Sequence, residues 1–252
     1  MASGMERCIQ REWLDELPPE EPRAIQSRRD LKRINAWMGN VQILAREIKL
    51  ARFQQRGVLR ILELGAGDGT FMLRLARRLS RQAPAEASLL DQQSIVSHET
   101  RRGFMELGWT VRTIRTDVFD WLRQSPMDSV DVIVANLFLH HFHEQDLKFL
   151  LHGAAHRTNL FIACEPRRSG FTLAATQFLR LIGCNEVTRH DAWLSVRAGF
   201  DGKEICSSWP KDDAWELREK PARLFSHLFR ARRRAAFPGD SNGERGEHGD
   251  EI

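Results

Sequence analysis

The fold of this chain is decided by the stretch Ile61-Leu62-Glu63-Leu64-Gly65-Ala66-Gly67-Asp68-Gly69-Thr70-Phe71. The stretch runs from an apolar strand through three alternating glycines into the start of a helix. Glycine allows positive φ and lets a ligand lie against the main chain, and the N-terminus of the next helix offers unpaired N–H groups. The stretch therefore predicts a ligand-binding turn, and its shape suits an adenosyl group.

The spacing of these glycines argues against a dinucleotide site. A dinucleotide-binding turn follows the pattern Gly-x-Gly-x-x-Gly, which would place a third glycine at position 70. This chain has Thr70 there, and its third glycine comes one residue earlier, at Gly69. A cradle for a pyrophosphate is therefore disfavoured.

Around this turn, short apolar runs alternate with helical segments. Such alternation specifies an α/β fold with a doubly wound, Rossmann-like sheet of parallel strands. We expect the buried strands at 58–64, 87–91, 109–114, 130–135 and 160–164. We expect the intervening helices at 70–81, 97–107 and 144–155.

The part of the chain before the first strand divides into two segments. Residues 1–21 are polar and end in prolines that resist helix formation, so we expect a flexible N-terminal lead. In 22–56 apolar residues recur at helical spacing, with a break near Gly39, which predicts two N-terminal helices.

The domain that follows is expected to span 57–235. A helical cap at about 168–200 would separate the fifth strand from the sixth, and 203–209 with 222–232 would complete the sheet as a hairpin. The tail 236–252 is acidic and has almost nothing apolar to bury, so we expect it to be disordered.

The composition points to a globular, cytoplasmic protein. Hydrophobic residues make up 42% and charged residues 29% of the chain. No apolar run reaches the roughly 20 residues that span a bilayer, and Glu6 and Arg7 interrupt any signal-peptide core. The four cysteines are far apart, without the paired spacing of zinc sites or disulfide frameworks, so we expect free thiols.

The net charge of +4 reflects arginine clusters without interleaved aromatic residues or a recognised nucleic-acid-binding module. Solvated helix faces explain such clusters more simply, so a nucleic-acid partner is not expected. A homodimer remains open at this stage.

Glu63 followed by Gly65, Gly67 and Gly69 resembles the first motif of class I (Rossmann-like) S-adenosylmethionine-dependent methyltransferases. The resemblance extends over residues 58–165. It implies that S-adenosylmethionine is the cofactor, that the turn, including Ala66, contacts the methionine part of that cofactor, and that Glu63 organises the turn.

The same resemblance assigns residues at the ends of the next strands. It implies that Asp91 accepts hydrogen bonds from the ribose hydroxyls, and that Asp117 with the Val118 backbone binds the adenine. Asn136, at the end of the fourth strand, joins this cofactor-binding set. Each acidic residue has an ordinary alternative as a helix cap, which is strongest for Asp117.

The fourth strand continues into Asn136-Leu137-Phe138-Leu139-His140-His141-Phe142. Methyltransferases that act on adenine or cytosine nitrogens carry Pro-Pro after the Asn or Asp, so base methylation is disfavoured. The Leu-His-His string resembles that of bacterial small-molecule methyltransferases.

A phenol or enol oxygen benefits from a nearby base that titrates around neutrality, which makes His140 and His141 the candidate catalytic residues. The alternative is that one of them caps the next helix or contacts the cofactor. Adjacent His143 suggests a metal only weakly, because no carboxylate shares the spacing, and we predict no metal.

Several other side chains are candidates for the acceptor pocket. His190 with Asp191 would form an orienting pair, and Glu165 would face the acceptor, although all three fit capping or surface roles equally well. The aromatic residues expected to line an apolar pocket are Trp37, Phe171, Phe178 and Trp193.

These features favour methylation of a small-molecule acceptor at a phenolic, quinol or polyketide-derived oxygen. A looser resemblance of Glu12-Trp13-Leu14-Asp15 and Cys164-Glu165-Pro166-Arg167-Arg168 is to methyltransferases found beside type III polyketide synthases. Two alternatives remain, an RNA or protein methyltransferase and a non-catalytic cofactor-binding protein. The intact motifs disfavour the latter.

Overall fold

The computed structural model describes residues 5–18, 20–51, 57–79, 85–93, 95–124 and 129–234. Within these residues seven strands form one sheet in the order β3-β2-β1-β4-β5-β7-β6. The strands are β1 (Leu59–Leu64), β2 (Ala85–Asp91), β3 (Thr110–Arg115), β4 (Val130–Asn136), β5 (Thr158–Pro166), β6 (Trp215–Ala222) and β7 (Ser226–Arg233).

The first five strands are parallel, and β7 runs antiparallel to both of its neighbours. This arrangement confirms the expected α/β fold with a doubly wound, Rossmann-like sheet. The predicted tail 236–252 lies outside the described residues.

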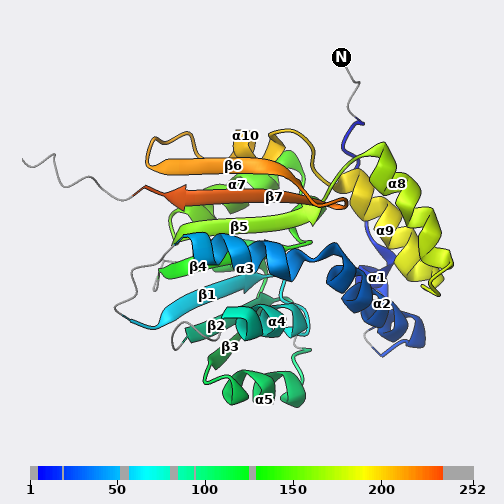
Figure 1. Cartoon of the computed structure of the whole chain (residues 1–252), viewed down its shortest axis with the longest axis horizontal. Helices are drawn as coiled ribbons and strands as arrows, with labels where there is room; N and C mark the ends of the chain where they lie inside the picture. Colours follow the sequence, from blue (N-terminus) through cyan, green and yellow to red (C-terminus); the bar gives the residue numbers. More distant parts are fainter. Residues whose placement is uncertain are drawn as a thin grey trace, which may run out of the picture.

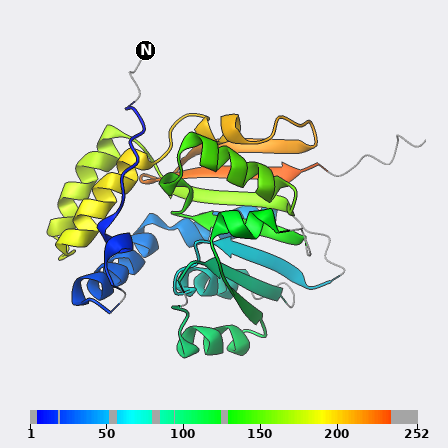
Figure 2. The same cartoon turned by 180° about the vertical axis from the view of Figure 1, so that it is seen from behind.

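Helices cover both faces of the sheet (Figures 1 and 2). One face packs against α3 (Asn40–Leu50), α4 (Thr70–Leu79) and α5 (His98–Glu106), and the other against α6 (Val118–Arg123), α7 (Glu144–Ala155) and α10 (Glu204–Ser208).

Successive residues of a strand point to opposite faces, so a central strand feeds both cores. Val132 and Val134 of β4 join the first core, and Ile133 and Ala135 the second. Because both faces are buried, the central strands are almost continuously apolar, and this pattern made them recognisable in the sequence.

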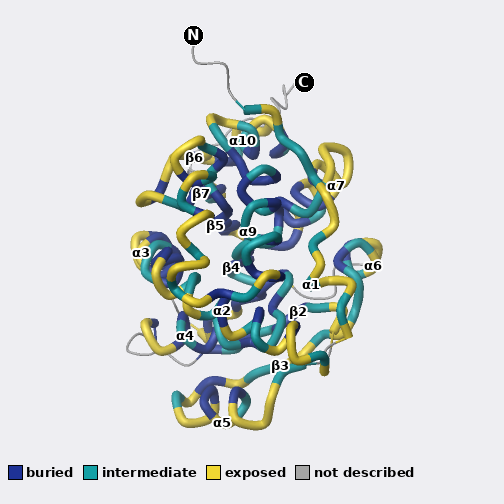
Figure 3. Tube along the Cα trace, turned by 90° about the vertical axis from the view of Figure 1, so that its right-hand side faces the viewer, coloured by how far each residue is buried: buried dark blue, intermediate teal, exposed yellow. Residues whose placement is uncertain are grey.

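A third group of helices gathers at the end of the sheet to which the parallel strands point (Figures 1 and 3). It consists of α1 (Trp13–Glu16), α2 (Pro22–Met38), α8 (Gly170–Thr176) and α9 (Glu186–Ala198), with the 3₁₀ turn η2 (Gln177–Arg180). The helical cap between β5 and β6 is thereby confirmed. It faces the edge where open α/β sheets bind their ligands.

The last part of the sheet differs from the expectation. Residues 203–209 were expected to form a strand, but they contain helix α10, whose first N–H groups, those of Ile205 and Cys206, donate to the Glu219 carboxylate. The partner of β7 is instead β6. This edge strand exposes several charged side chains, which protect a free edge but hide the alternation that would mark a strand.

The N-terminal lead also differs from the expectation of flexibility. The Cys8 N–H donates to the Arg197 carbonyl, and the Arg7 guanidinium donates to the carbonyls of Ala198, Leu139 and His140. Residues 5–17 therefore form an N-terminal strap that lies along α9 and across the end of the sheet. These contacts join residues more than 130 positions apart, so local sequence could not predict them.

All four cysteines carry free thiols, as expected. None of the described helices combines the length and the apolar character that a membrane crossing requires.

Candidate functional site

A cavity of about 560 Å³ opens at the carboxyl ends of β1, β2 and β4. Its walls come from the glycine turn, the ends of these strands, helix α2 and the N-terminal strap. It brings together most of the predicted site residues, which are Glu63, Gly65, Ala66, Gly67, Asp91, Asp117, Val118, Asn136, His140 and His141.

The three glycines of the turn all have positive φ, at 66°, 53° and 72° for Gly65, Gly67 and Gly69. A Cβ on Gly65 would lie 2.2 Å from the Phe138 ring, so this position requires glycine for packing. A Cβ on Gly67 would meet nothing within 4 Å, because this residue faces the cavity.

Gly69 has another role than the one expected. It is absent from the cavity lining, and a Cβ there would lie 2.8 Å from the Leu89 side chain. The third glycine therefore allows the start of α4 to pack against β2, and it does not contact the ligand space. The other two glycines form the ligand-facing part of the turn.

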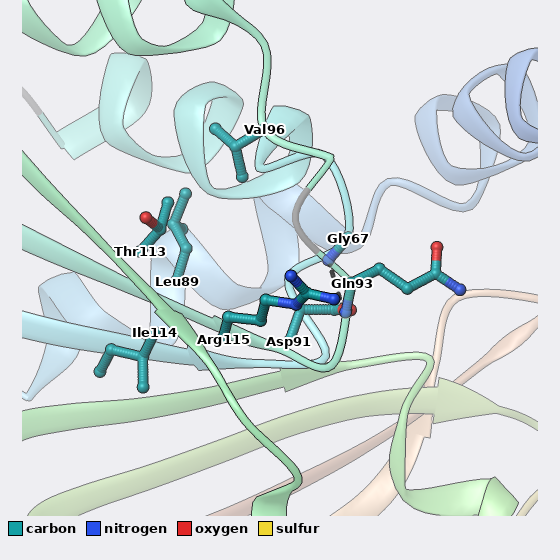
Figure 4. Close-up of a pocket in the computed structure, with 8 residues that line it drawn as sticks. All are labelled: Gly67, Leu89, Asp91, Gln93, Val96, Thr113, Ile114 and Arg115. Carbon is teal, nitrogen blue, oxygen red and sulfur yellow. Dashed lines mark hydrogen bonds between the residues drawn. The ribbon is translucent and has the colours of Figure 1, made fainter. Parts of the chain in front are cut away.

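Asp91 ties the glycine turn to the end of β2. Its Oδ2 accepts the Gly67 N–H at 2.8 Å and its Oδ1 accepts the Gln93 N–H at 2.7 Å. Figure 4 shows Asp91 and Gly67 joined in this way beside a small hollow, which the Ile114 and Arg115 side chains also line. A carboxylate oxygen can accept more than one hydrogen bond, and each Asp91 oxygen accepts one here. Asp91 therefore retains acceptor capacity for a diol.

Asp117 combines the two roles that the sequence suggested. Its Oδ1 accepts the Phe119 N–H at 2.7 Å and so caps α6, while its Oδ2 accepts the Gln92 amide at 2.6 Å. Both Asp117 and Val118 line the cavity. Asp117 is therefore a helix cap, and its position in the cavity wall is compatible with the adenine contact that the resemblance implies.

Glu63 is buried beneath the turn, and its Oε2 has no hydrogen-bond partner. Burial, together with the charges of Asp68 and Asp91, raises the pKa of this carboxyl well above its usual range. A buried acceptor without a partner in the wall of a cavity suits a ligand that brings a donor or a positive charge.

The two adjacent histidines lie in the 3₁₀ turn η1 (Leu139–His141) after β4. His140 is buried, with its Nδ1 2.8 Å from Glu165 Oε2 and its Nε2 3.6 Å from Glu12 Oε1. Burial alone would lower the pKa of His140, but hydrogen bonding to Glu12 and Glu165 and their charges raise it to about 9. His140 is therefore an imidazolium at neutral pH.

His141 is in the opposite state. Burial and the positive charge of neighbouring His140 lower the pKa of His141 to about 4, against the opposing effect of Glu12 and Glu165. The neutral His141 ring lines the cavity and retains a free lone pair at neutral pH. Of the two predicted catalytic residues, only His141 is neutral and able to accept a proton, although its pKa of about 4 lies below the near-neutral value expected of a general base.

Glu165 holds the η1 turn in place. Its carboxylate accepts the N–H groups of Phe138, Leu139 and His140 as well as bonding to the His140 ring. It is fully buried and outside the cavity lining, so it does not face the acceptor as proposed from the sequence. Its role is to cap the turn and balance the His140 charge.

The N-terminal strap was not predicted to reach the cavity, although Glu12-Trp13-Leu14-Asp15 carried part of the looser resemblance. Glu12 and Asp15 line the cavity with Ser195 of α9, whose hydroxyl donates to Glu12. Burial would raise the pKa of Glu12, but hydrogen bonding to His140 lowers it overall, whereas burial and the charges of Glu12 and Asp191 raise the pKa of Asp15 to about 6. The strap thus supplies two carboxyl groups to the site.

Glu12, His140 and His141 each bring one potential metal-ligand atom within 4.8 Å of the other two. The carboxylate that completes this group is Glu12, which is far from the histidines in sequence, and His143 takes no part in it. Because the His140 pKa is raised, a proton on that ring provides the positive charge between the carboxylates.

The aromatic lining differs from the one expected. Trp37, Phe171 and Phe178 are more than half exposed, and they do not line the cavity, nor does Trp193. The aromatic residues that do line it are Phe71, Phe138 and Phe142. His190 and Asp191 do form a pair at 2.9 Å, but Asp191 binds the N–H groups of the strap and not the cavity.

Comparison with known proteins places this site in context. Residues 61–159 match the family model described as a methyltransferase domain. These residues contain the glycine turn, Asp91, Asp117 and both histidines. A search of curated protein sequences finds no match.

Solved structures share the fold at low sequence identity. The plantazolicin methyltransferase BamL, in complex with a triazolic desmethylPZN analog and SAH, has a TM-score of 0.61 at 12% identity, covering 84% of this chain and 90% of that chain. The plantazolicin methyltransferase BpumL in complex with SAH has a TM-score of 0.57 at 14% identity, covering 85% and 92%.

An O-methyltransferase family protein from Burkholderia thailandensis has a TM-score of 0.55 at 16% identity, covering 87% of this chain and 64% of that chain. These likenesses confirm the Rossmann-like methyltransferase fold that the sequence predicted.

Proposed function

We propose that this chain transfers a methyl group from S-adenosylmethionine to an oxygen of a small phenolic, quinol or polyketide-derived acceptor. The observation that carries the proposal is the single cavity that joins the glycine turn and Asp91 to the neutral ring of His141. The family match over 61–159 and the SAH bound in structural neighbours support the choice of cofactor.

The walls of the cavity fit the parts of this cofactor. Gly67 leaves the main chain open to a ligand, and Asp91 has spare acceptor capacity beside it. Glu63 offers a buried oxygen without a partner, which suits a positively charged group. In this proposal Gly65, Ala66 and Gly67 border the amino-acid end of the cofactor, Asp91 its ribose, and Asp117 with Val118 its adenine.

When bound, S-adenosylmethionine supplies an electrophilic methyl group on a sulfonium. The protein's part is to hold the acceptor oxygen in line with that methyl group, so that a bond to carbon forms as the bond to sulfur breaks and its electron pair returns to sulfur. His141 takes the proton of the acceptor hydroxyl. His140 and Glu165 act as positioning residues that fix the turn carrying His141.

Transfer of a labelled methyl group from S-adenosylmethionine to a panel of phenols tests this proposal. His141→Ala should lower kcat by about 10²-fold or more, the usual contribution of a positioned acid or base. His143→Ala is the matched control, because His143 lies outside the cavity lining. Equal rates in the two variants would remove His141 from the chemistry.

We also retain the prediction that no metal takes part. The described residues that could hold an ion are Glu12, His140 and His141, and methyl transfer should proceed unchanged after treatment with a chelator.

A further inference from the structure

A polar relay connects the β6–β7 hairpin to the cavity through α3. The Ser226 hydroxyl donates to Asn40 Oδ1 at 2.6 Å, and Asn40 Nδ2 donates to Asn136 Oδ1 at 2.8 Å. Ser226 and Asn40 are both completely buried, whereas Asn136 is the last residue of β4 and lines the cavity. The cofactor-binding residues predicted from the sequence included Asn136 but neither Asn40 nor Ser226.

The relay engages one end of the Asn136 amide. Its Oδ1 accepts the Asn40 N–H, and the Nδ2 group, which only donates, has no partner among the residues that the structure describes and is the donor that Asn136 offers to a ligand.

The residue after Asn136 has a strained backbone conformation. Leu137 has a positive φ of 53°, which is uncommon for a residue other than glycine, and its N–H donates to the Cys164 carbonyl at 2.9 Å. Strained backbone of this kind persists where the surrounding structure over-determines it. The chain therefore turns sharply directly after the amide, and Asn136 stays at the cavity edge.

We propose that Asn136, oriented by Asn40 and Ser226, donates a hydrogen bond to an anionic oxygen of the bound ligand. The inference rests on the proposed function, because both candidate oxygens come from it. One is the phenolate oxygen of the acceptor, and the other is a carboxylate oxygen of the cofactor. Asn40 and Ser226 are positioning residues.

Asn136→Asp is the decisive variant, because it keeps the size of the side chain and its bond from Asn40 while replacing the free donor by an acceptor. Two ratios of dissociation constants are measured. The first compares 4-nitrophenolate with 4-nitroaniline in the SAH complex, and it tests the acceptor oxygen. The second compares SAH with its carboxamide analogue, which keeps the amino group but has no carboxylate, and it tests the cofactor oxygen.

In at least one pair the wild type should favour the member that carries the anionic oxygen, and Asn136→Asp should reduce that preference by about tenfold or more. Ser226→Ala should reduce the same ratio by a smaller factor, because the Asn40 amide is then free to turn. A merely structural role of these residues would weaken both members of each pair equally.

The proposal is overturned if the wild type shows neither preference, or if Asn136→Asp leaves both ratios unchanged. The proposed function fails in a different way. In that case the folded wild type binds neither SAH nor its carboxamide analogue.

Discussion

At the residue scale, the histidine pair shows how two identical neighbouring side chains acquire opposite properties. His140 lies between the carboxylates of Glu12 and Glu165, which stabilise its charge even though the ring is buried. His141 is half-buried without a close carboxylate bond and lies beside that charge, with the two ring centroids 4.2 Å apart. The charge on the first ring therefore keeps the second neutral.

Stability should depend on pH in two windows. The pKa of His140 is raised to about 9 in the folded protein from about 6.5 in the unfolded chain, so its contribution is fully present below pH ~6.5 and is lost as the pH rises through about 9. The pKa of His141 is lowered to about 4, so protonation of the unfolded chain lowers stability as the pH falls from about 6.5 toward about 4.

Urea unfolding between pH ~4 and ~9 measures both effects. The wild type should lose on the order of 2 to 3 kcal/mol between pH ~6.5 and ~9, and His140→Gln should flatten that alkaline limb. His141→Asn should flatten the acid limb and leave the alkaline one in place. An alkaline limb that survives in His140→Gln would show that the buried imidazolium is not its source.

The glycine turn allows packing and ligand access to be separated. Gly65→Ala should destabilise the protein by about 1 to 3 kcal/mol, because its Cβ would meet the Phe138 ring. Gly67→Ala has room in the unliganded protein and should lose only about 1 kcal/mol from its positive φ, yet its methyl group enters the cavity. Thermal unfolding should therefore show the larger loss of stability in Gly65→Ala, whereas SAH titration should show the larger loss of affinity in Gly67→Ala.

At the element scale, the sequence predicted those parts of the fold whose signal is local. The strands β1, β2, β4 and β5 supply buried apolar residues to the two cores, whereas edge strand β3 has no buried residue. The turn after β1 carries its glycines in one short stretch. Strand β6 and the N-terminal strap lacked such a signal. Their positions depend on distant partners, β7 for the first and α9 for the second.

The same reasoning explains which part of the site was predicted. Glu63, Asp91, Asn136 and the histidines follow strand ends in order, whereas Glu12 joins them only through the path of the strap.

The buried Asp191 carboxylate is one of several groups that hold the strap to α9. Asp191 accepts the N–H groups of Trp13 and Leu14 at 2.9 and 3.0 Å, and the Trp13 ring stacks on His190. Asp191→Ala should release the strap, so that trypsin cleaves after Arg11 faster and methyl transfer falls through loss of Glu12 from the site.

Glu186→Ala is the control, because Glu186 is exposed in the first turn of the same helix. Unchanged cleavage in Asp191→Ala would show that other contacts are sufficient to hold the strap.

At the scale of the whole molecule, the site depends on the topology of the sheet. Parallel strands bring the residues after β1, β2 and β4 to one edge of the sheet. The helices α1, α2 and α9 lie over that edge (Figure 3). Segments from residue 12 to residue 195 thus line one cavity. Substitution of a cavity-lining residue at the carboxyl end of a strand should alter ligand binding and have little effect on the packing of the sheet core.

The most direct measurement is a calorimetric titration of the purified protein with S-adenosylmethionine, in the wild type, Gly67→Arg and Asp91→Ala. Asp120→Ala is the control, since Asp120 pairs with Arg123 on the exposed face of α6. We predict micromolar binding by the wild type and the control, and loss of binding in the other two variants. Absence of binding by a folded wild type, or equal binding by Gly67→Arg, would contradict the assignment of this cavity to the cofactor.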